Sequence, residues 1–380
     1  MIKILIVGGK LQGIEIAYLA KKAGYYSILL DKNIDIPAKG LTDRFIQGNV
    51  LSKEKMLKLF REVDIVIPAV ENKKILETLL EYGEITMTKV IFDKNSYHIS
   101  SSKQLSNKLF EDLKLPLPEK YPNCNYPVII KPDHLSGSSN VHKAFSKDEV
   151  GSIIAQMDGE IVIQEYLEGD SYSLEVLGDG ESFFYPQITE VVVDKNYDCK
   201  RIIAPAKISS ELKEQFYTIA EKLAGHLKIR GIFDIEVIND NGTLKLLEID
   251  ARFPSQTPIS VYQSTGINMV RILVELALRT FTRMKKTIDK VCYYQQIVVD
   301  DYSIKVIGEH VMEGCINLRI VDSFFGADEA ITDFVEGYNN FTAIIIVTAD
   351  THENAYEKFL MCIDNIKSKI KNTSVAFMEG

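Results

Sequence analysis

Cysteine is scarce in this sequence and is never arranged as a pair of ligands. Five cysteines are scattered among 380 residues, an odd number without any CxxC spacing: Cys124, Cys199, Cys292, Cys315 and Cys362. Zinc sites built on cysteine need closely spaced pairs, and disulfide frameworks need an even set in a short chain. The sequence therefore excludes both and predicts a protein of a reducing compartment.

Basic runs and long apolar runs are also missing. The formal net charge is -9, whereas a surface that binds nucleic acid needs clustered Lys and Arg. No apolar run approaches membrane-spanning length, and the chain begins directly with the strand-like IKILIVGG, without a charged leader. We expect a soluble cytoplasmic protein of two or three domains that acts on small molecules, with neither nucleic acid nor membrane as partner.

Several short catalytic motifs are absent as well. HExxH, GxSxG and GxxxxGK[ST] do not occur, and the glycine pattern nearest to a dinucleotide fingerprint, GGKLQG at 8–13, is not GxGxxG. Apolar runs at 2–7, 27–30 and 63–70 alternate with helical segments, as in a small doubly wound domain. Asp31 ends one of these runs, where it could accept a ribose hydroxyl or simply hold a turn.

What the sequence does contain is an acidic hairpin. The segments 231–238 (GIFDIEVI) and 243–250 (TLKLLEID) alternate apolar and polar residues, with turn-forming residues 239–242 between them. Because every second side chain of a strand shares a face, we expect Asp234 and Glu236 on one face, Glu248 and Asp250 on one face, and the apolar residues opposite. The opposite face would hold Phe233, Ile235, Val237, Leu247 and Ile249. The four acids converge only if the hairpin loop has an odd number of residues.

Clustered carboxylates repel one another unless a cation or water compensates them. Mg²⁺ prefers oxygen ligands and commonly bridges one or two carboxylates to substrate phosphates, so the hairpin indicates a nucleotide site. Arg252 lies on the same face as Asp250, where a guanidinium can balance the acids or hold a phosphoryl group. The alternative is a solvated hairpin with surface ion pairs.

The middle of the chain supplies candidate partners for a nucleotide. A helix from Lys103 to Leu113 precedes an apolar strand at 128–131, and Lys131 then precedes PDHLSGSSN, whose small residues can wrap phosphate oxygens. A second strand at 161–166 leads to Asp170, an acceptor, and to Ser173 and Glu175 on one face of the next strand. The simpler interpretation is a plain loop for the first of these segments and an edge strand with a turn for the second. After residue 291 the sequence is strand-rich and shows no catalytic motif.

In this order the features resemble the ATP-grasp ligases. The resemblance rests on Lys103, on Lys131 before the Gly/Ser loop, on QEYLEG at 164–169, on Glu236 and Glu248 twelve residues apart, and on Arg252. It departs from the family pattern at Asp250, where members usually carry Asn. The resemblance implies an α/β protein with a Rossmann-like N-terminal domain (1–92), an ATP-grasp central subdomain (93–178) and a C-terminal subdomain (179–380) that carries the metal-binding hairpin and ends in a strand-rich part.

Three blocks are similar to the ATP-grasp ligases of pyrrolysine biosynthesis. They are VGGKLQGIEIAYLAKKAG with LLDKN, EYLEGDSYSLEVLGDG, and EIDARFPSQTPISVYQSTGIN. The resemblance implies an enzyme that uses ATP and Mg²⁺, with two ions, to activate the carboxylate of 3-methyl-D-ornithine as an acyl-phosphate. The side-chain amine of L-lysine then displaces phosphate, and an amide, ADP and phosphate are released.

The resemblance also implies roles for individual residues. Catalysis falls to Arg252, which stabilises the acyl-phosphate, and to Asp234 or Glu175, which orient the amine. ATP contacts are implied for Lys103, Lys131, Ser138, Gln164, Glu165, Tyr166, Leu167, Glu168 and Asp170. Metal ligands are implied at Glu236, Glu248 and Asp250. Substrate contacts are implied for Lys10, Leu11, Gln12, Glu71, Ser173, Glu175, Asp234, Ser255 and Thr257, and nucleotide contacts of the N-terminal domain for Asp31, Asn49 and Val50.

Three other functions stay open at this point. Another ATP-grasp amino-acid ligase would share the nucleotide residues and differ only in its substrate pocket. A dinucleotide-dependent oxidoreductase would explain GGKLQG and Asp31 but leaves the acidic hairpin unexplained. A nucleotide-binding module without catalysis would have no reason to keep the carboxylates and lysines.

Overall fold

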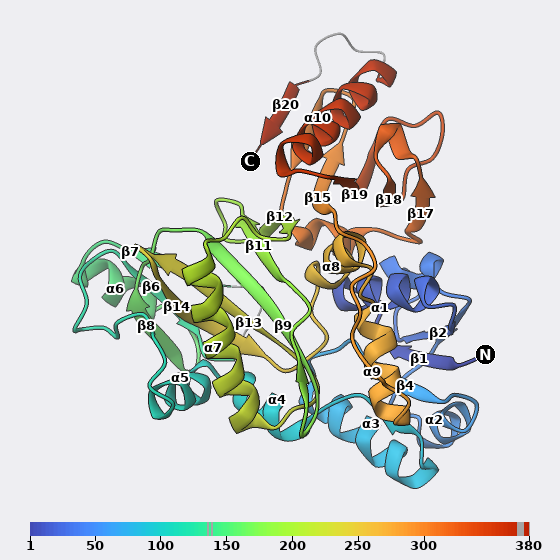
Figure 1. The fold of residues 1–380 in the computed structure, drawn as a ribbon, viewed down its shortest axis with the longest axis horizontal. Helices are drawn as coiled ribbons and strands as arrows, with labels where there is room; N and C mark the ends of the chain where they lie inside the picture. The colour runs from blue at the N-terminus through green and yellow to red at the C-terminus, as the bar shows by residue number, and fades with distance from the viewer. Residues whose placement is uncertain (135–136, 138–139, 371–375, 380) are drawn as a thin grey trace.

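The N-terminal part of the protein is a parallel sheet in the order β3-β2-β1-β4-β5 (Figure 1). The computed structural model describes residues 1–134, 137, 140–370 and 376–379. The strands of this sheet are β1 (Lys3–Val7), β2 (Tyr26–Asp31), β3 (Arg44–Gln47), β4 (Ile65–Pro68) and β5 (Lys89–Val90). The helices between them are α1 (Leu11–Lys22), the 3-10 helix η1 (Pro37–Leu41), α2 (Lys53–Phe60) and α3 (Lys73–Thr86).

This sheet is covered on both faces, as its almost continuously apolar strands require. Ile4 and Ile6 of β1 pack on the side of α1, whereas Leu5 and Val7 pack on the side of α2 and α3. The doubly wound domain expected from the sequence is therefore present. The turn into α1 needs glycine, because a Cβ on Gly13 would lie 2.4 Å from the carbonyl oxygen of Gly8.

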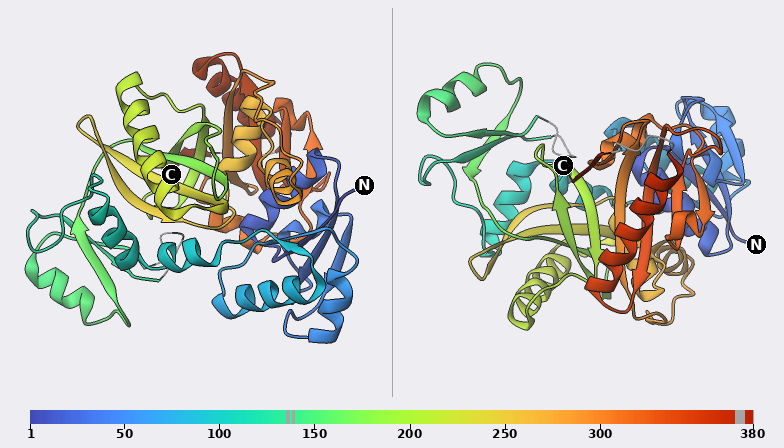
Figure 2. Two further views of the ribbon diagram at one scale, coloured as in Figure 1. Left: turned by 60° about the horizontal axis from the view of Figure 1, so that its bottom comes forward. Right: turned by 90° about the horizontal axis from the view of Figure 1, so that it is seen from above.

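A small antiparallel sheet, β7-β6-β8, projects from the rest of the molecule with α6 on its face (Figure 2). Its elements are β6 (Val128–Pro132), β7 (His142–Ala144), α6 (Lys147–Ile154) and β8 (Ile161–Glu165). Two helices, α4 (Lys94–Ser100) and α5 (Lys103–Asp112), connect it to the N-terminal sheet. Ser138 lies outside the described residues.

The remainder is built on one large sheet whose main path is β14-β13-β9-β11-β12-β15-β19-β18-β17. Its strands are β9 (Ser171–Asp179), β10 (Phe183–Phe184), β11 (Ile188–Val193), β12 (Cys199–Ala204), β13 (Arg230–Asp240), β14 (Thr243–Asp250), β15 (Val291–Val299), β16 (Ser303–Val306), β17 (Arg319–Asp322), β18 (Glu329–Thr332), β19 (Phe341–Ala349) and β20 (Ala376–Glu379). Its helices are α7 (Ser210–Leu227), α8 (Thr257–Thr265), α9 (Met269–Leu278), α10 (His352–Lys369), η2 (Glu309–Gly314) and η3 (Phe324–Gly326).

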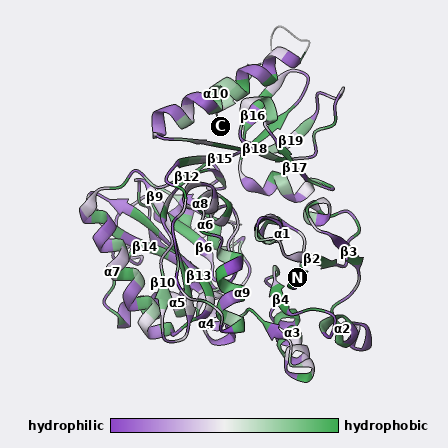
Figure 3. Ribbon diagram, turned by 45° about the vertical axis from the view of Figure 1, so that its right-hand side comes forward, coloured by the Kyte–Doolittle hydropathy of each residue, from purple (hydrophilic) through white to green (hydrophobic). Residues whose placement is uncertain are grey.

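Amphipathic helices cover this sheet. The apolar stripe of α7, which includes Phe216 and Leu223, packs on the apolar side of β13 and β14, and α10 packs on β15 and β19. In Figure 3 both helices also carry hydrophilic residues, as surface helices do. On the other side, α8 and α9 lie against α1, so one apolar core joins the large sheet to the N-terminal sheet.

The domain division stays a prediction, with one adjustment that we propose. The expected boundary at residue 178 cuts through β9, which pairs with β13 and β11 in the large sheet. We therefore place that boundary before β9, near residue 170. No helix within the described residues has the length and apolar content needed to cross a membrane.

Candidate active site

The acids of the hairpin formed by β13 and β14 converge on one face. Asp234 pairs with Asp250 across the two strands, and Glu236 pairs with Glu248. Directly opposed residues of neighbouring strands project to the same face. The predicted acidic cluster is therefore confirmed.

The cluster forms by a different route from the one expected. The loop of the hairpin has two residues, Asn241 and Gly242, both with positive φ, which is an even loop. A β-bulge brings the acids back to one face. Asp240 pairs with Thr243 and Val237 with Leu246, but the next pair is Glu236 with Glu248, so Leu247 is an extra residue in its strand. The expectation of an odd loop was wrong, because an extra residue in a strand corrects the register as well as one in the loop does.

The bulge also moves Leu247. Leu244, Leu246 and Ile249 are buried in the core beneath α7, whereas Leu247 is only partly buried and lines the cavity on the acidic side. Its expected place on the apolar face was therefore wrong, and Leu246 takes that place. The consequence is an apolar wall beside the carboxylates.

The carboxylates are held where water cannot fully solvate them. Burial, with the neighbouring acids Asp250 and Glu236, raises the pKa of Asp234 well above its usual range. Burial and Glu248 raise the pKa of Glu236 to about 8, and burial raises that of Asp250 to about 7. One oxygen of Asp234 lacks a hydrogen-bond partner among the described residues. A hard divalent cation with oxygen ligands fits such a donor set.

Three cations flank the acids. The Lys103 ammonium lies 3.6 Å from an oxygen of Glu248, and burial lowers the pKa of Lys131. The guanidinium Nε of Arg252 lies 2.8 Å from Asp250 and 3.0 Å from Glu71. A buried charge without an opposite charge nearby is costly, so these cations and the acids of the hairpin stabilise one another.

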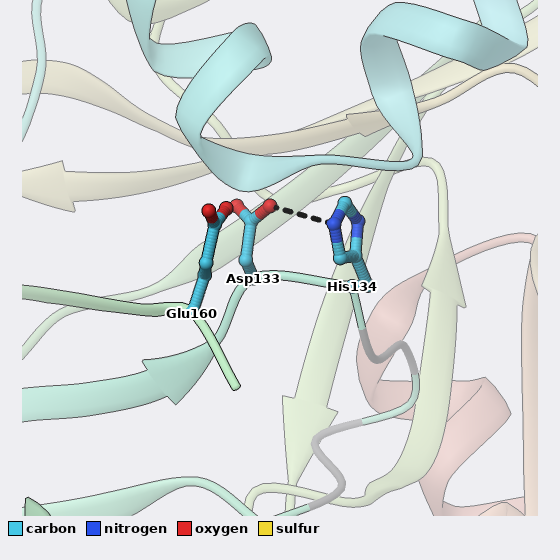
Figure 4. Close-up of side chains that lie close together, drawn as sticks. All are labelled: Asp133, His134 and Glu160. Carbon is cyan, nitrogen blue, oxygen red and sulfur yellow. Dashed lines mark ion pairs between the residues drawn. The ribbon is translucent and has the colours of Figure 1, made fainter. Parts of the chain in front are cut away.

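Lys103 is positioned by its helix start. The Ser102 side chain accepts a hydrogen bond from Leu105 N at 3.1 Å and donates to Asp133 at 2.8 Å, and Gln104 N donates to Asp133 at 2.7 Å. Asp133 also pairs with His134 at 3.2 Å, beside Glu160 (Figure 4). Because both Asp133 oxygens are used in this way, the group anchors α5.

A cavity of about 300 Å³ lies between the small sheet and the acidic hairpin. Most of the predicted nucleotide residues line it: Lys103, Lys131, Gln164, Glu165, Tyr166, Leu167 and Glu168. Apolar side chains of Ile129, Val191 and Leu247 add a surface that suits a flat base, with Glu236 and Glu248 also on the wall. Asp170 does not line this cavity.

A second cavity, of about 800 Å³, lies at the carboxyl ends of the parallel strands of the N-terminal sheet, the place where open α/β sheets bind ligands. Many predicted residues line it: Lys10, Leu11, Gln12, Asp31, Asn49, Val50, Glu71, Arg252 and Ser255. Gln12 donates to Glu71 at 2.9 Å. Asp31 accepts from Gly9 N at 3.0 Å, so that carboxylate also holds the glycine turn.

Four predicted substrate residues lie beneath the cavities instead of on their walls. Ser173, Glu175, Asp234 and Thr257 are buried, and Glu175 is 0% exposed. Burial raises the pKa of Glu175 to about 7, partly offset by a hydrogen bond with Thr257. Glu175 pairs with Asp234 across β9 and β13. These side chains pack beneath the hairpin. The alternation of polar and apolar residues in the sequence could not distinguish that buried position from contact with substrate.

Sequence reasoning missed one wall of the larger cavity. Glu309, His310 and Glu313 of η2 line it, and Lys10 forms an ion pair with Glu313. Ser255 donates to Glu309 at 3.3 Å, and burial raises the pKa of Glu309 to about 7. No motif marks this segment, so only its tertiary position reveals it.

Comparison with known proteins agrees with this geometry. A family model described as ATP-grasp domain matches residues 100–256. The 3-methyl-D-ornithine–L-lysine ligase of Methanosarcina mazei is 35% identical over 316 residues, 81% of each chain, and that of Methanosarcina barkeri is 35% identical over 81% of this chain and 83% of its own.

Two solved structures show the same fold. A complex of N5-carboxyaminoimidazole ribonucleotide synthetase with ADP has a TM-score of 0.71 at 16% identity, covering 97% of this chain and 98% of its own. The biotin carboxylase domain of the Hydrogenobacter thermophilus 2-oxoglutarate carboxylase, solved with MgADP, has a TM-score of 0.74 at 15% identity, covering 96% and 90%. The fold class expected from the sequence is confirmed.

Proposed function

This chain belongs to the family of the 3-methyl-D-ornithine–L-lysine ligases, and from this premise we propose that it joins 3-methyl-D-ornithine to the side-chain amine of L-lysine in pyrrolysine biosynthesis. It is an ATP-dependent ligase that forms an amide. The observation that carries the proposal is a pair of cavities that share Gly137: the one suited to a nucleotide is lined by Glu236 and Glu248 of the acidic hairpin, and the one suited to amino acids is lined by Arg252.

The smaller cavity is the ATP site of this proposal. Gln164, Glu165, Tyr166 and Leu167 would meet the adenine, and Glu168 the ribose. The Glu165 carboxylate is fixed beside this cavity, because it accepts hydrogen bonds from Lys245 Nζ at 2.6 Å and from Glu119 N at 2.8 Å. Asp170 would contact ATP only indirectly, because it does not line the cavity. Its backbone carbonyl accepts a hydrogen bond from Asn239 N at 2.9 Å.

The phosphates of ATP would lie toward the charged end of this cavity. Lys103 and Lys131 would neutralise them, and Glu236, Glu248 and Asp250 would hold Mg²⁺, which we propose to be two ions. Bound there, Mg²⁺ withdraws charge from the phosphate oxygens and so assists phosphoryl transfer. The buried carboxylates with raised pKa values support this ligand set, because a cation replaces the protons that they would otherwise hold.

The amino acids would occupy the larger cavity. Its wall carries both signs of charge, with Lys10, Arg252 and His310 against Glu71, Glu309 and Glu313. Zwitterions need such a mixture, because each has a carboxylate and at least one ammonium. Asp31, Asn49 and Val50 lie on the same wall, so a nucleotide contact there remains part of the proposal.

Chemistry would follow in two steps. The substrate carboxylate attacks the terminal phosphoryl group of ATP, the bond to ADP breaks, and Arg252 stabilises the resulting acyl-phosphate. The neutral side-chain amine of lysine then attacks the acyl carbon, the bond from that carbon to the phosphate oxygen breaks, and the proton released from nitrogen leaves with the phosphate. Asp234 and Glu175 would act through the hairpin by fixing its acids, since burial removes Glu175 from direct contact with the amine.

ADP release with product analysis tests the proposal. The protein is given ATP and Mg²⁺ with 3-methyl-D-ornithine and L-lysine, and with each alone, and the product mass is measured. ADP release that needs both amino acids and yields their condensed mass is expected. Release with other amino-acid pairs but not this one would identify a ligase of different substrates.

A matched variant tests the metal ligands. Glu248→Gln keeps the size of the side chain but removes its charge beside Lys103, and ADP release should be lost while the far-UV circular dichroism is unchanged. Glu84→Gln, on the exposed side of α3, is the control. A fully active Glu248→Gln enzyme would remove Glu248 from the ligand set.

A further inference from the structure

His310 lies where the two cavities meet, in a segment that carries no catalytic motif. It belongs to η2 and lines the larger cavity with Arg252 and Ser255. Its side chain is 42% exposed. A histidine with this access to the cavity can contact a ligand there.

Asp198 fixes the ring of His310. The imidazole Nδ1 lies 2.8 Å from one carboxylate oxygen of Asp198, and the backbone N of His310 donates to the other at 3.3 Å. Asp198 comes from the turn between β11 and β12 and reaches η2 because residue 308 is glycine. A Cβ on Gly308 would lie 2.0 Å from the Asp198 carboxylate. Nδ1 therefore carries the shared proton, and the other nitrogen is left to face a ligand.

The second nitrogen, Nε2, is aimed at the border of the two cavities. A Cβ placed on Gly137 would lie 3.0 Å from it. Gly137 is on the wall of both cavities, in the Gly/Ser segment that follows β6 and Lys131. A group that passes from the nucleotide cavity to the amino-acid cavity would come within reach of Nε2.

The ring carries positive charge near neutral pH. The hydrogen bond with Asp198 raises the pKa of His310 to about 9, with further increases from the charges of Asp198, Glu309 and Glu313. Asp198 lies on the turn between β11 and β12, and Glu309 and Glu313 lie on η2. An imidazolium held at one nitrogen donates a directed, charge-assisted hydrogen bond from the other.

We propose that His310, oriented by Asp198, is a catalytic residue that donates from Nε2 to the phosphoryl group while that group moves from ATP to the substrate carboxylate. The inference rests on the proposed function. In this step the bond between the terminal phosphorus and the ADP oxygen breaks and a bond to the carboxylate oxygen forms. His310 keeps its proton throughout and stabilises charge on the phosphoryl oxygens.

The alternative role for such a histidine is a general base that takes the proton of the lysine amine. That role needs the neutral ring, whereas the proposed role needs the cation. The two therefore predict opposite pH dependence. Trapping the acyl-phosphate with hydroxylamine separates them further, because hydroxylamine replaces lysine and its attack needs no help from a base on the enzyme.

The test measures hydroxamate formation from ATP, Mg²⁺, 3-methyl-D-ornithine and hydroxylamine between pH 7 and 10. His310→Gln should lower kcat by about 100-fold, the usual cost of one lost donor, with little change in KM for ATP. The wild-type kcat should fall as pH rises through about 9, and His310→Gln should lack this fall. His310→Lys, which keeps a cation, should recover part of the rate, and Asp198→Asn should shift the fall to lower pH.

His226→Gln, on the exposed side of α7, is the matched control and should leave the rate unchanged. An unaltered kcat in a folded His310→Gln enzyme, or a wild-type rate that rises through pH 9, would overturn the inference. Wild-type protein that forms neither hydroxamate nor ligation product would instead contradict the proposed function, so the two failures are distinguishable.

Discussion

Neutralising Glu236 should stabilise the metal-free protein while removing its activity. Burial and the charge of Glu248 raise the pKa of Glu236 from 4.5 to about 8. At pH 7 the unfolded chain would have this carboxyl ionised, whereas the folded chain keeps it mostly protonated. That difference costs on the order of 3 kcal/mol, from 2.5 pH units at about 1.4 kcal/mol each. Glu236→Gln removes this cost at nearly constant volume.

The sign of the effect sets the pH range. For an acid whose pKa is raised on folding, stability is complete below the unfolded pKa of 4.5 and decreases as pH rises toward about 8. The midpoint of thermal unfolding without metal should therefore be similar for both proteins near pH 5. At pH 8 the midpoint of Glu236→Gln should be several degrees higher than that of the wild type.

Thermal unfolding with and without Mg²⁺ and ATP is the assay. Mg²⁺ with ATP should raise the wild-type midpoint strongly and the variant's only slightly, because the stabilisation by a ligand grows with the logarithm of its concentration divided by Kd. Glu84→Gln, exposed on α3, should follow the wild type throughout. The reasoning is refuted if Glu236→Gln is less stable than the wild type at pH 8 without metal, or if the nucleotide stabilises both proteins equally.

Three further predictions follow from the geometry. Lys131→Met should raise KM for ATP by about 10- to 100-fold, from a lost charged contact of about 1.5–3 kcal/mol. Lys143→Met should raise it less, because Lys143 contacts Tyr166 and Glu168 but does not line the cavity; equal effects would contradict the phosphate assignment. Deleting Leu247 should preserve ADP release while raising KM for ATP, because Glu236 then pairs with Glu248 in a regular ladder but the cavity loses an apolar side chain; loss of ADP release in a folded deletion variant would contradict this pairing. Glu15→Gln should remove a pH dependence of stability, which urea unfolding can measure. Burial raises the pKa of Glu15 to about 8, so the free energy of unfolding of the wild type should fall by at most about 1.4 kcal/mol per pH unit between pH 5 and 8. An equal fall in the variant would assign the pH dependence to another group.

Local sequence patterns were sufficient for most elements. The apolar runs of the N-terminal sheet, the start of α5 at Lys103 and the stripe of α7 all appear where their periodicity places them. Each of these elements is marked by the spacing of its own apolar residues, which can be read without knowing its partners. The late strand and helix, β19 and α10, were likewise expected from one apolar run and one amphipathic segment.

The candidate nucleotide residues were also within reach of the sequence, because charged residues at strand and helix ends follow a fixed order along the chain. Lys103, Lys131 and Glu248 indeed share one cavity. The alternation of polar and apolar residues could not predict how deeply each side chain is buried. Ser173 and Glu175 alternate correctly on β9, but the strand is covered on both sides, so these residues are buried instead of lining the cavity.

The sequence by itself identified the acids of the hairpin, through their alternation, and the fold class, through its resemblance to the ATP-grasp ligases. The tertiary structure alone decided the register and the substrate wall. The bulge at Leu247 replaces the odd loop that the sequence required, because register depends on every pairing along the strand. Contacts of η2 with α1 and η1, which are remote in sequence, together with the Asp198 carboxylate, place His310 beside Gly137.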